Sequence, residues 1–239
     1  MVLPSRLKVR LVRRLLGWDV HPTAYIGRSV IVVGHLVMGP GASIGPFNVI
    51  KDLEELRLGE GASIASRNWI AGFPRSADQS TDAFPHSPQR RPSLVLGRGA
   101  MITVAHDIDC SDRVDIGDYS SLAGFRCTVL THSLNLVRDR FVTGPVEIGA
   151  HTAVMSGSTL LSGTRVPARS IVSAGSVVNT PLTTELTFYS GNPAVAMRPL
   201  PETLAFFHRG ERTTGDATIA RRDDGGNGAG APAFEEVRR

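Results

Sequence analysis

Histidine is the side chain best suited to accept a proton near neutral pH, and this chain has seven of them. They stand at positions 21, 35, 86, 106, 132, 151 and 208. His132 differs from the others because its polar segment, THSLN, interrupts a regular sequence repeat. A histidine in such a loop can act as the general base that deprotonates an attacking hydroxyl. We therefore take His132 as the candidate catalytic base.

Other polar residues close to His132 could support it or bind a second substrate. His106 lies in TVAHDIDC at a repeat position that elsewhere holds Ser or Thr, which favours a structural role, with acceptor binding as the alternative. Asp107 and Asp109 could bind acceptor hydroxyls, orient a histidine or cap a corner. We assign His106, Asp107 and Asp109 to the candidate acceptor site, and Glu147 is a further candidate to polarise His132.

These residues are embedded in a repeat of six. From Ile148 to Val178 an aliphatic residue stands at every sixth position, and the residue four places after each of the first five is Ser or Thr. Earlier arrays run through Val20, Ile26, Val32, Met38, Ile44 and Ile50, then Leu58, Ile64 and Ile70, then Leu96, Ile102, Ile108 and Val114, and in a shifted phase Ile116 and Leu122.

A period of six predicts a short strand and a corner, repeated, and three such units form one coil of roughly 18 residues in a parallel β-helix. Stacked coils bury a continuous aliphatic column that one coil cannot bury alone. The sequence thus predicts an all-β fold, a parallel β-helix over residues 18–200. A basic amphipathic helix over 1–17 precedes it, and a short helix and disordered tail over 201–239 follow it.

Two segments break the repeat, at about 72–93 and 131–145. A corner of a β-helix can eject a loop without disturbing the stacked core, and such loops commonly form the functional face. We expect the active site to lie beside these two loops.

Several motifs resemble those of the left-handed β-helix acyltransferases, which are built from hexapeptide repeats. The similar segments are THSLN at 131–135, GPVEIG at 144–149, SAGSVVNTPL at 173–182 and YSGNPAVAMRPL at 189–200. The resemblance covers residues 18–200, is nearest to the sugar and polysaccharide O-acetyltransferases, and implies the left-handed sense of the helix. It also implies that His132 is the base that activates an acceptor hydroxyl.

The resemblance further implies acetyl coenzyme A as the cosubstrate, with no metal. Residues of the last coils are then expected to contact it. They are Ser156, Gly157, Ala174, Gly175 and Asn179 along the pantetheine arm, and Arg198 at the nucleotide phosphates. The family relationship implies a homotrimer with sites between neighbouring chains, and a sugar or polysaccharide precursor as the acceptor.

Charge is concentrated at the N-terminus. Five of the 26 basic residues lie in residues 1–17, which leaves 21 against 22 acidic residues in the rest of the chain. A near-neutral body argues against nucleic acid as a partner. The N-terminal segment predicts a helix with Leu7, Leu11, Leu15 and Leu16 near one face, either capping the β-helix or lying on an anionic membrane.

The location follows from weaker signals. The chain has two cysteines, Cys110 and Cys127, with no zinc-binding spacing, which suggests buried thiols in a reducing compartment. No apolar run reaches the roughly 18 residues of a membrane span, and no secretory signal is recognisable. We expect a cytoplasmic protein, with the inner face of the membrane as an alternative location.

Two other functions share the predicted fold. A γ-class carbonic anhydrase requires three histidines on zinc, but His106, His132 and His151 are 26 and 19 residues apart. A non-catalytic β-helix scaffold or binding protein is the second alternative.

Overall fold

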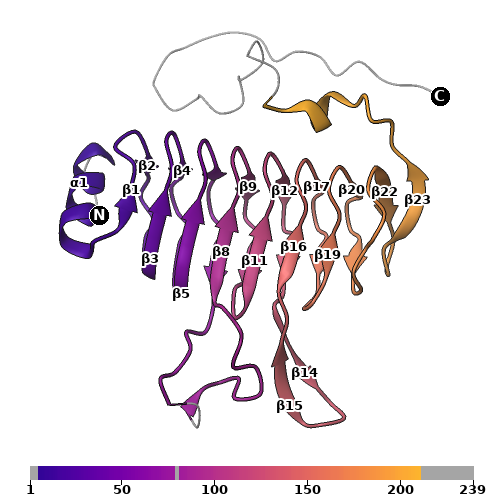
Figure 1. The fold of residues 1–239 in the computed structure, drawn as a ribbon, viewed down its shortest axis with the longest axis horizontal. Helices are drawn as coiled ribbons and strands as arrows, with labels where there is room; N and C mark the ends of the chain where they lie inside the picture. The colour runs from indigo at the N-terminus through magenta and orange to yellow at the C-terminus, as the bar shows by residue number, and fades with distance from the viewer. Residues whose placement is uncertain (1–4, 79–80, 211–239) are drawn as a thin grey trace.

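The structure is a computed structural model that describes residues 5–78 and 81–210. Helix α1 (Ser5–Leu16) is followed by short parallel strands that stack coil upon coil along one axis (Figure 1). The predicted fold class, a parallel β-helix of hexapeptide repeats, is confirmed.

The coils form three faces. The first face consists of β1 (Asp19–Val20), the second halves of β3 (Val30–Met38) and β5 (Val49–Leu58), β8 (Ser93–Leu96), β11 (Arg113–Ile116), β16 (Val146–Ile148) and β19 (Arg165–Val166). The second face consists of the first halves of β3 and β5, then β7 (Trp69–Ala71), β10 (Asp107–Asp109), β13 (Thr128–Val129), β18 (Thr159–Leu160) and β21 (Val177–Val178). The third face consists of β2 (Tyr25–Ile26), β4 (Ser43–Ile44), β6 (Ser63–Ile64), β9 (Met101–Val104), β12 (Ser121–Phe125), β17 (Ala153–Val154), β20 (Ile171–Val172) and β22 (Thr187–Ser190).

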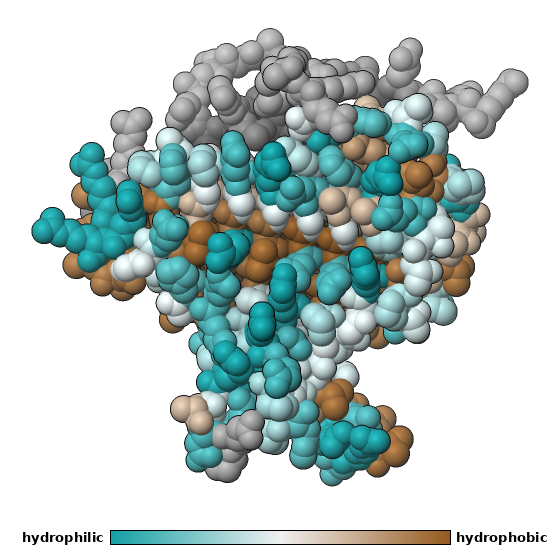
Figure 2. Space-filling model, in the orientation of Figure 1, coloured by the Kyte–Doolittle hydropathy of each residue, from teal (hydrophilic) through white to brown (hydrophobic). Residues whose placement is uncertain are grey.

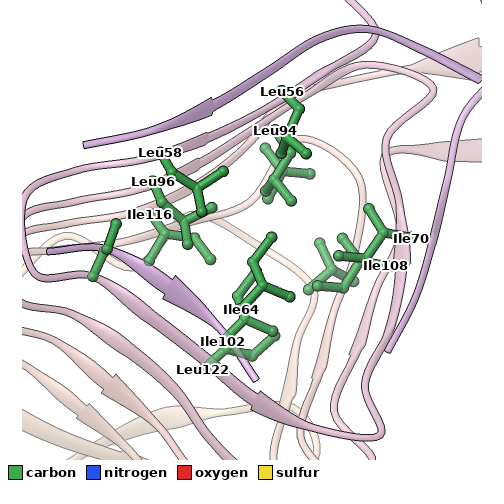
Figure 3. Packing of buried hydrophobic residues seen from close by; sticks show 14 of the residues in the cluster. Leu56, Leu58, Ile64, Ile70, Leu94, Leu96, Ile102, Ile108, Ile116 and Leu122 are labelled. Carbon is green, nitrogen blue, oxygen red and sulfur yellow. The ribbon is translucent and has the colours of Figure 1, made fainter. Parts of the chain in front are cut away.

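Aliphatic side chains of successive coils stack inside the prism. Figure 3 shows Leu58, Leu96 and Ile116 in one column, with Ile64, Ile102 and Leu122 in another. Each of these six side chains is at most 2% exposed. Stacking removes about 25 cal/mol of apolar hydration cost for each Å² buried, and this supplies the main stabilisation of the coils.

The recurring Ser and Thr residues are buried at the corners. Thr152, Ser158, Thr164, Ser170 and Ser176 are each at most 1% exposed. The hydroxyls of the first four donate to corner carbonyls; that of Ser158, for example, donates to the carbonyl of Ser173 at 3.0 Å. The hydroxyl of Ser176 instead accepts from the N–H of Gly191 at 3.3 Å. A buried carbonyl without a partner is costly, which explains why small hydroxyl side chains recur here.

The predicted phase is wrong in the first coil. Val32, expected in the core, is 59% exposed, whereas Ile31 packs against the core. Ile26 pairs with Ile44, whereas Ile31 pairs with Ile50, so the turn between these two inward positions is one residue shorter in the first coil than in the second. Because side chains alternate along a strand, a shift of one residue exchanges the inward and outward positions.

Helix α1 packs against β1 and β2 at the end of the prism (Figure 1). It buries Lys8 and Val9, and the Lys8 ammonium donates to the carbonyls of Ile26 and Gly27 at 3.1 and 2.8 Å. The side with Leu7 and Leu15, which are 42% and 73% exposed, is therefore not the side that packs against the prism. Burying the helix through a lysine leaves most of its leucine side open to solvent.

Both excursions from the repeat leave the same edge, between the second and first faces, and project to the same side in Figure 1. One comprises residues 72–92, between β7 and β8. The other contains the hairpin β14 (His132–Asn135) and β15 (Arg140–Thr143). The coil between them turns directly from β10 into β11, so the two excursions stand as neighbours across a single coil.

The C-terminal end closes with β23 (Val195–Pro199), antiparallel to β22, and with a 3-10 turn at Ala205–His208. The tail predicted to be disordered lies, from residue 211 onwards, outside the described residues. Within the described part of the chain, no helix combines the length and the apolar character needed to cross a membrane.

Candidate active site

His132 begins the hairpin strand β14, and its ring contacts the last residue of β10. The Nδ1 atom of His132 lies 2.8 Å from Oδ2 of Asp109. An ionised carboxylate can only accept, so Nδ1 carries the proton and donates it. The lone pair of Nε2 is then left to accept a proton from a substrate.

Asp109 is held ionised by a dense set of donors. Its Oδ2 also accepts from the backbone and hydroxyl of Thr131, both at 2.8 Å, and its Oδ1 accepts from the hydroxyl of Ser111 at 2.5 Å. Burial opposes ionisation, but the hydrogen bonds from His132, Ser111 and Thr131 outweigh it and lower the pKa of Asp109 to about 2. The same hydrogen bond to Asp109 raises the pKa of His132.

Three phenyl rings surround the imidazole of His132. The ring centroids of Phe73, Phe84 and Phe141 lie 6.1, 5.5 and 6.4 Å from that of His132. Phe73 and Phe84 come from the 72–92 excursion, and Phe141 comes from β15. Both excursions thus contribute to one apolar surround that limits the rotation of the ring.

Arg90 ties the 72–92 excursion to the coil that carries Asp109. Its guanidinium group is 1% exposed and pairs with the carboxylate of Asp82 at 2.7 Å. It also donates to the carbonyl of Ser111 at 3.1 Å and to the carbonyl of Phe73. A second contact places it 4.9 Å from the centre of the Phe84 ring. Arg90 therefore contacts Ser111, which binds Asp109, and also Phe73 and Phe84, which pack against His132.

His106 lies in the interior rather than in the site. It is 1% exposed and occupies a corner column in which Asn48, Asn68, His106 and Cys127 are linked by hydrogen bonds. The backbone N–H of Cys127 donates to Nδ1 of His106 at 3.1 Å, and Nε2 lies 2.9 Å from the hydroxyl of Thr103. Burial lowers the pKa of His106 to about 4. The geometry supports the structural alternative and leaves no surface of His106 to contact an acceptor.

The other two acidic candidates, Asp107 and Glu147, lie on different faces of the prism. Asp107 is exposed on the second face, two residues from Asp109 along the same strand. Glu147 lies on β16 of the first face and pairs with Arg165 at 3.6 Å. The carboxylate on His132 is thus that of Asp109, a role for which the sequence also offered Asp107 and Glu147.

The histidines of the carbonic anhydrase alternative do not converge. His106 is inside the core, His132 pairs with Asp109, and His151 stacks on Tyr119 at 5.3 Å between ring centroids. Within residues 5–78 and 81–210, no three His, Cys, Asp or Glu side chains form a group that could hold a metal ion.

Four of the predicted cofactor residues share the corner between the third and second faces. One level of that corner is formed by Ser156 and Gly157, and the next by Ala174 and Gly175. The two levels are joined because the N–H of Gly175 donates to the carbonyl of Ser156 at 2.9 Å. The N–H of Gly157 likewise donates to the carbonyl of Phe125 at 3.0 Å. These amides are consumed by coil stacking, so a ligand here would meet the glycine surface rather than free N–H groups.

The same corner carries side chains in the earlier coils. At the level equivalent to Gly157 and Gly175, the earlier coils have Phe47, Arg67, Ala105 and Arg126, all with positive φ. A Cβ atom on Gly175 would meet nothing within 4 Å, and one on Gly157 would meet only the backbone nitrogen of Gly175 at 3.9 Å. Internal packing therefore does not require glycine at these two levels, and the glycines leave the corner bare.

Asn179 and Arg198 lie apart from that corner. Asn179 is exposed and belongs to the outward row Lys51, Ala71, Asp109, Leu130, Leu161 and Asn179 of the second face. It stands three strands from Asp109, about 14 Å at the usual strand spacing. Arg198 lies on β23 beside the third face, where its guanidinium stacks on Phe188 at 5.0 Å.

Sequence reasoning missed Arg90, Asp82 and the three phenylalanines. Their only signal was position, since four of the five lie in the 72–92 excursion and Phe141 lies in the other segment that breaks the repeat. A buried arginine in a loop rich in Pro and Ser has no periodic signature.

No protein-family profile matches the chain, and no curated protein sequence matches it. Among solved structures, the N-acyltransferase AntD from Bacillus cereus, with dTDP-4-amino-4,6-dideoxyglucose and coenzyme A, has a TM-score of 0.54 and 13% identity over 72% of this chain and 84% of that chain. A hexapeptide-repeat acetyltransferase from Vibrio cholerae, complexed with acetyl coenzyme A, has a TM-score of 0.48 and 20% identity over 61% of this chain and 71% of that chain.

The chain is a hexapeptide-repeat parallel β-helix, and it shares its fold with AntD. At this level of identity the similarity establishes the fold, and the activity has to be argued from the site.

Proposed function

We propose that this protein is an acyl-coenzyme-A-dependent O-acyltransferase that moves an acetyl group to a hydroxyl of a sugar or polysaccharide precursor. The observation that carries the proposal is the pair of His132 and Asp109, a histidine with its Nδ1 proton held by an ionised carboxylate. That arrangement supports a general base whose Nε2 points its lone pair to a substrate.

The chain's own residues handle one proton. Nε2 of His132 takes the proton of the acceptor hydroxyl as its oxygen attacks, and the Asp109 carboxylate stabilises the imidazolium that forms. A bound acyl thioester supplies the activated acyl group, which passes from sulfur to the acceptor oxygen. The proton held at Nε2 is then available to the departing thiolate, so no covalent intermediate on the protein is needed.

The corner of the last coils fits a thin ligand arm. Gly157 and Gly175 leave the surface bare where Phe47, Arg67 and Arg126 project from earlier coils. Glycine at such positions lets a ligand approach the backbone closely. Ser156 and Ala174 border the same surface, and Asn179 lies beyond it, at the other end of β21. We assign these five residues to the pantetheine arm, with Arg198 as the phosphate contact. AntD, which shares the fold, was solved with coenzyme A, and this supports coenzyme A as the cosubstrate.

We also propose a homotrimer. The hairpin β14–β15 projects from the prism with exposed Leu134, Leu136, Val137 and Phe141, and Figure 2 shows hydrophobic side chains gathered at that hairpin. An apolar projection of this kind is normally covered by a partner, and in a closed ring each chain would cover its neighbour's site. Light scattering coupled to gel filtration should give three times the mass of one chain, and a monomer would exclude the ring.

A peripheral membrane contact through α1 is the remaining partner proposal. Leu7 and Leu15 are exposed, and Arg10, Arg13 and Arg14 are exposed on the same helix. Leucines beside arginines suit an anionic lipid surface. This would place a cytoplasmic enzyme at the inner face of the membrane, where lipid-linked glycan precursors can be presented.

The test is release of free thiol from acetyl coenzyme A in the presence of sugars and nucleotide sugars, with wild type beside His132→Ala. Turnover that depends on both an acceptor and His132 supports the proposal. The alternative, a non-catalytic scaffold or binding protein, predicts neither turnover nor binding of coenzyme A.

A further inference from the structure

A pocket of about 350 Å³ opens on the second face directly beside the catalytic pair. It runs over β5, β7 and β10, and Trp69, Lys51, Asp107, Asp109 and Phe73 are among its lining residues. Asp109 contacts His132, and the ring of Phe73 packs against it, so one end of the pocket is the reaction centre. The other end carries groups that the proposed chemistry does not use.

Trp69 forms the floor of that outer end. It is 49% exposed on the outward side of β7, with its strand neighbour Ile70 fully buried beneath the face. An indole ring left half exposed on a rigid strand exposes apolar surface to water at a cost. A broad apolar surface beside polar groups is typical of a ligand site.

The rim of the pocket is polar and carries mixed charge. The ammonium of Lys51 lies 6.0 Å from the centre of the Trp69 ring and pairs with Asp52 at 2.8 Å. Asp107 stands directly opposite Trp69 on the next strand. One ammonium and two carboxylates supply donors and acceptors for the hydroxyls of a ligand. An anionic ligand would be repelled by the two carboxylates more than it is attracted by the one ammonium.

The spacing also fits. Trp69 and Asp109 lie on adjacent strands and two residues apart along them, which places their Cα atoms about 8 Å from each other. A pyranose ring stacked on Trp69 would span most of that distance. One of its hydroxyls, or one on the next sugar unit, would then reach Nε2 of His132.

We propose that Trp69, Lys51 and Asp107 form the acceptor subsite, and that it binds an uncharged hexopyranose unit stacked on the Trp69 indole. The apolar C–H face of the sugar covers the indole, and its ring hydroxyls bind Lys51 and Asp107. The proposal rests on the acyltransferase function and narrows its acceptor to a neutral sugar unit in place of an acidic one.

The two tryptophans of the chain provide a test that needs no turnover. The other tryptophan, Trp18, is 8% exposed. Because the chain has two tryptophans, the tryptophan fluorescence of a Trp18→Phe variant comes from Trp69 alone. The probes are hexasaccharides of glucose, galactose, mannose and N-acetylglucosamine, with a sialic acid hexamer as the anionic probe. We expect at least one neutral probe to shield Trp69 from acrylamide quenching, while the sialic acid hexamer does not.

Turnover then separates this subsite from the function itself. Trp69→Ala should raise KM for the acceptor about tenfold and leave KM for acetyl coenzyme A unchanged. Tyr25→Ala, which removes a similarly exposed aromatic side chain on the third face, should change neither KM.

Turnover with an unaltered acceptor KM in Trp69→Ala overturns the subsite and leaves the acyltransferase standing. Shielding by a neutral probe without turnover keeps the subsite and overturns the acyltransferase. Shielding by the anionic probe alone, or by none, overturns the subsite.

Discussion

The imidazole of His132 and the carboxylate of Asp109 are joined by a 2.8 Å hydrogen bond although they lie on successive coils. Asp109 ends a strand of the second face, and His132 follows the next strand of that face at the point where the chain leaves the prism. The stack of coils, rather than nearness in sequence, therefore creates the pair. The same stack sets the pocket of Trp69 on one side of the pair and the bare glycine corner further along the axis.

Replacing Asp109 by Asn should change both the rate and its pH dependence. His132 must be neutral to accept a proton, and the hydrogen bond to Asp109 raises its pKa. In wild type the rate should thus rise with pH through a pKa above the ordinary value of about 6.5. Asp109→Asn removes the charge, so the acidic limb should move to lower pH while kcat falls about 100-fold or more, because the imidazolium loses its partner. A pH profile of kcat/KM checks this, and an unmoved limb would mean that another group titrates.

Placing a side chain on the glycine corner should block the cosubstrate without unfolding the protein. Gly175→Arg places an arginine where Arg126, two coils earlier in the same corner, already has positive φ. The left-handed conformation costs a non-glycine residue about 1 kcal/mol. Binding of acetyl coenzyme A, measured by calorimetry, should be lost.

The matched control for that variant is Gly41→Arg. Gly41 also has positive φ and an open Cβ position, but it lies near the opposite end of the prism. It should show the same small loss of stability and normal binding. Equal binding by both variants would remove the corner from the cofactor site.

Arg90→Met should loosen the excursion that holds Phe73 and Phe84 against His132. The change leaves the buried carboxylate of Asp82 unpaired, which costs about 3–5 kcal/mol in local or global stability. We expect lower kcat, a normal KM for acetyl coenzyme A, and faster hydrogen exchange over residues 72–92. Adding Asp82→Asn should recover part of the stability, because no unpaired charge remains. A fully additive double variant, measured by urea unfolding, would contradict the pairing.

Association of α1 with anionic membranes should depend on its exposed leucines. A Leu7→Ser, Leu15→Ser variant should lose sedimentation with phosphatidylglycerol vesicles, and added salt should weaken the binding of wild type, since arginine attraction is screened. Phosphatidylcholine vesicles should bind neither protein.

The control variant replaces Val195 and Met197 with Ser. These two side chains are 52% and 60% exposed and lie on β23, at the other end of the prism. If the control and the α1 variant sediment alike, the contact does not run through α1.

The sequence predicts the coils well because the rule behind them is local. A residue such as Val172 must point inward whenever its strand follows a corner of fixed length, and the run from Ile148 to Val178 keeps that length. The rule fails at Val32, because the turn between Ile26 and Ile31 is one residue shorter than the repeat requires. For α1 the spacing of the leucines predicts an apolar face but not which side packs against the prism, and the burial of Lys8 decides that side.

The active site was predictable in part. His132 could be chosen because it interrupts the repeat. Its partner could not be chosen among Asp107, Asp109 and Glu147, because the coil offset from Asp107 to Thr128 is 21 residues instead of the regular 18. Arg90 had no sequence signal, since its role comes from contacts with Ser111 and Phe73 that only the folded excursion brings together.

The most direct test of the account is the rate of acetyl coenzyme A turnover by His132→Ala with a productive sugar acceptor, measured by thiol release. His21→Ala, a histidine in the first coil, is the control. The account predicts a loss of about 100-fold or more in kcat for His132→Ala, with coenzyme A binding retained and the control unaffected. Turnover in His132→Ala equal to wild type would contradict it.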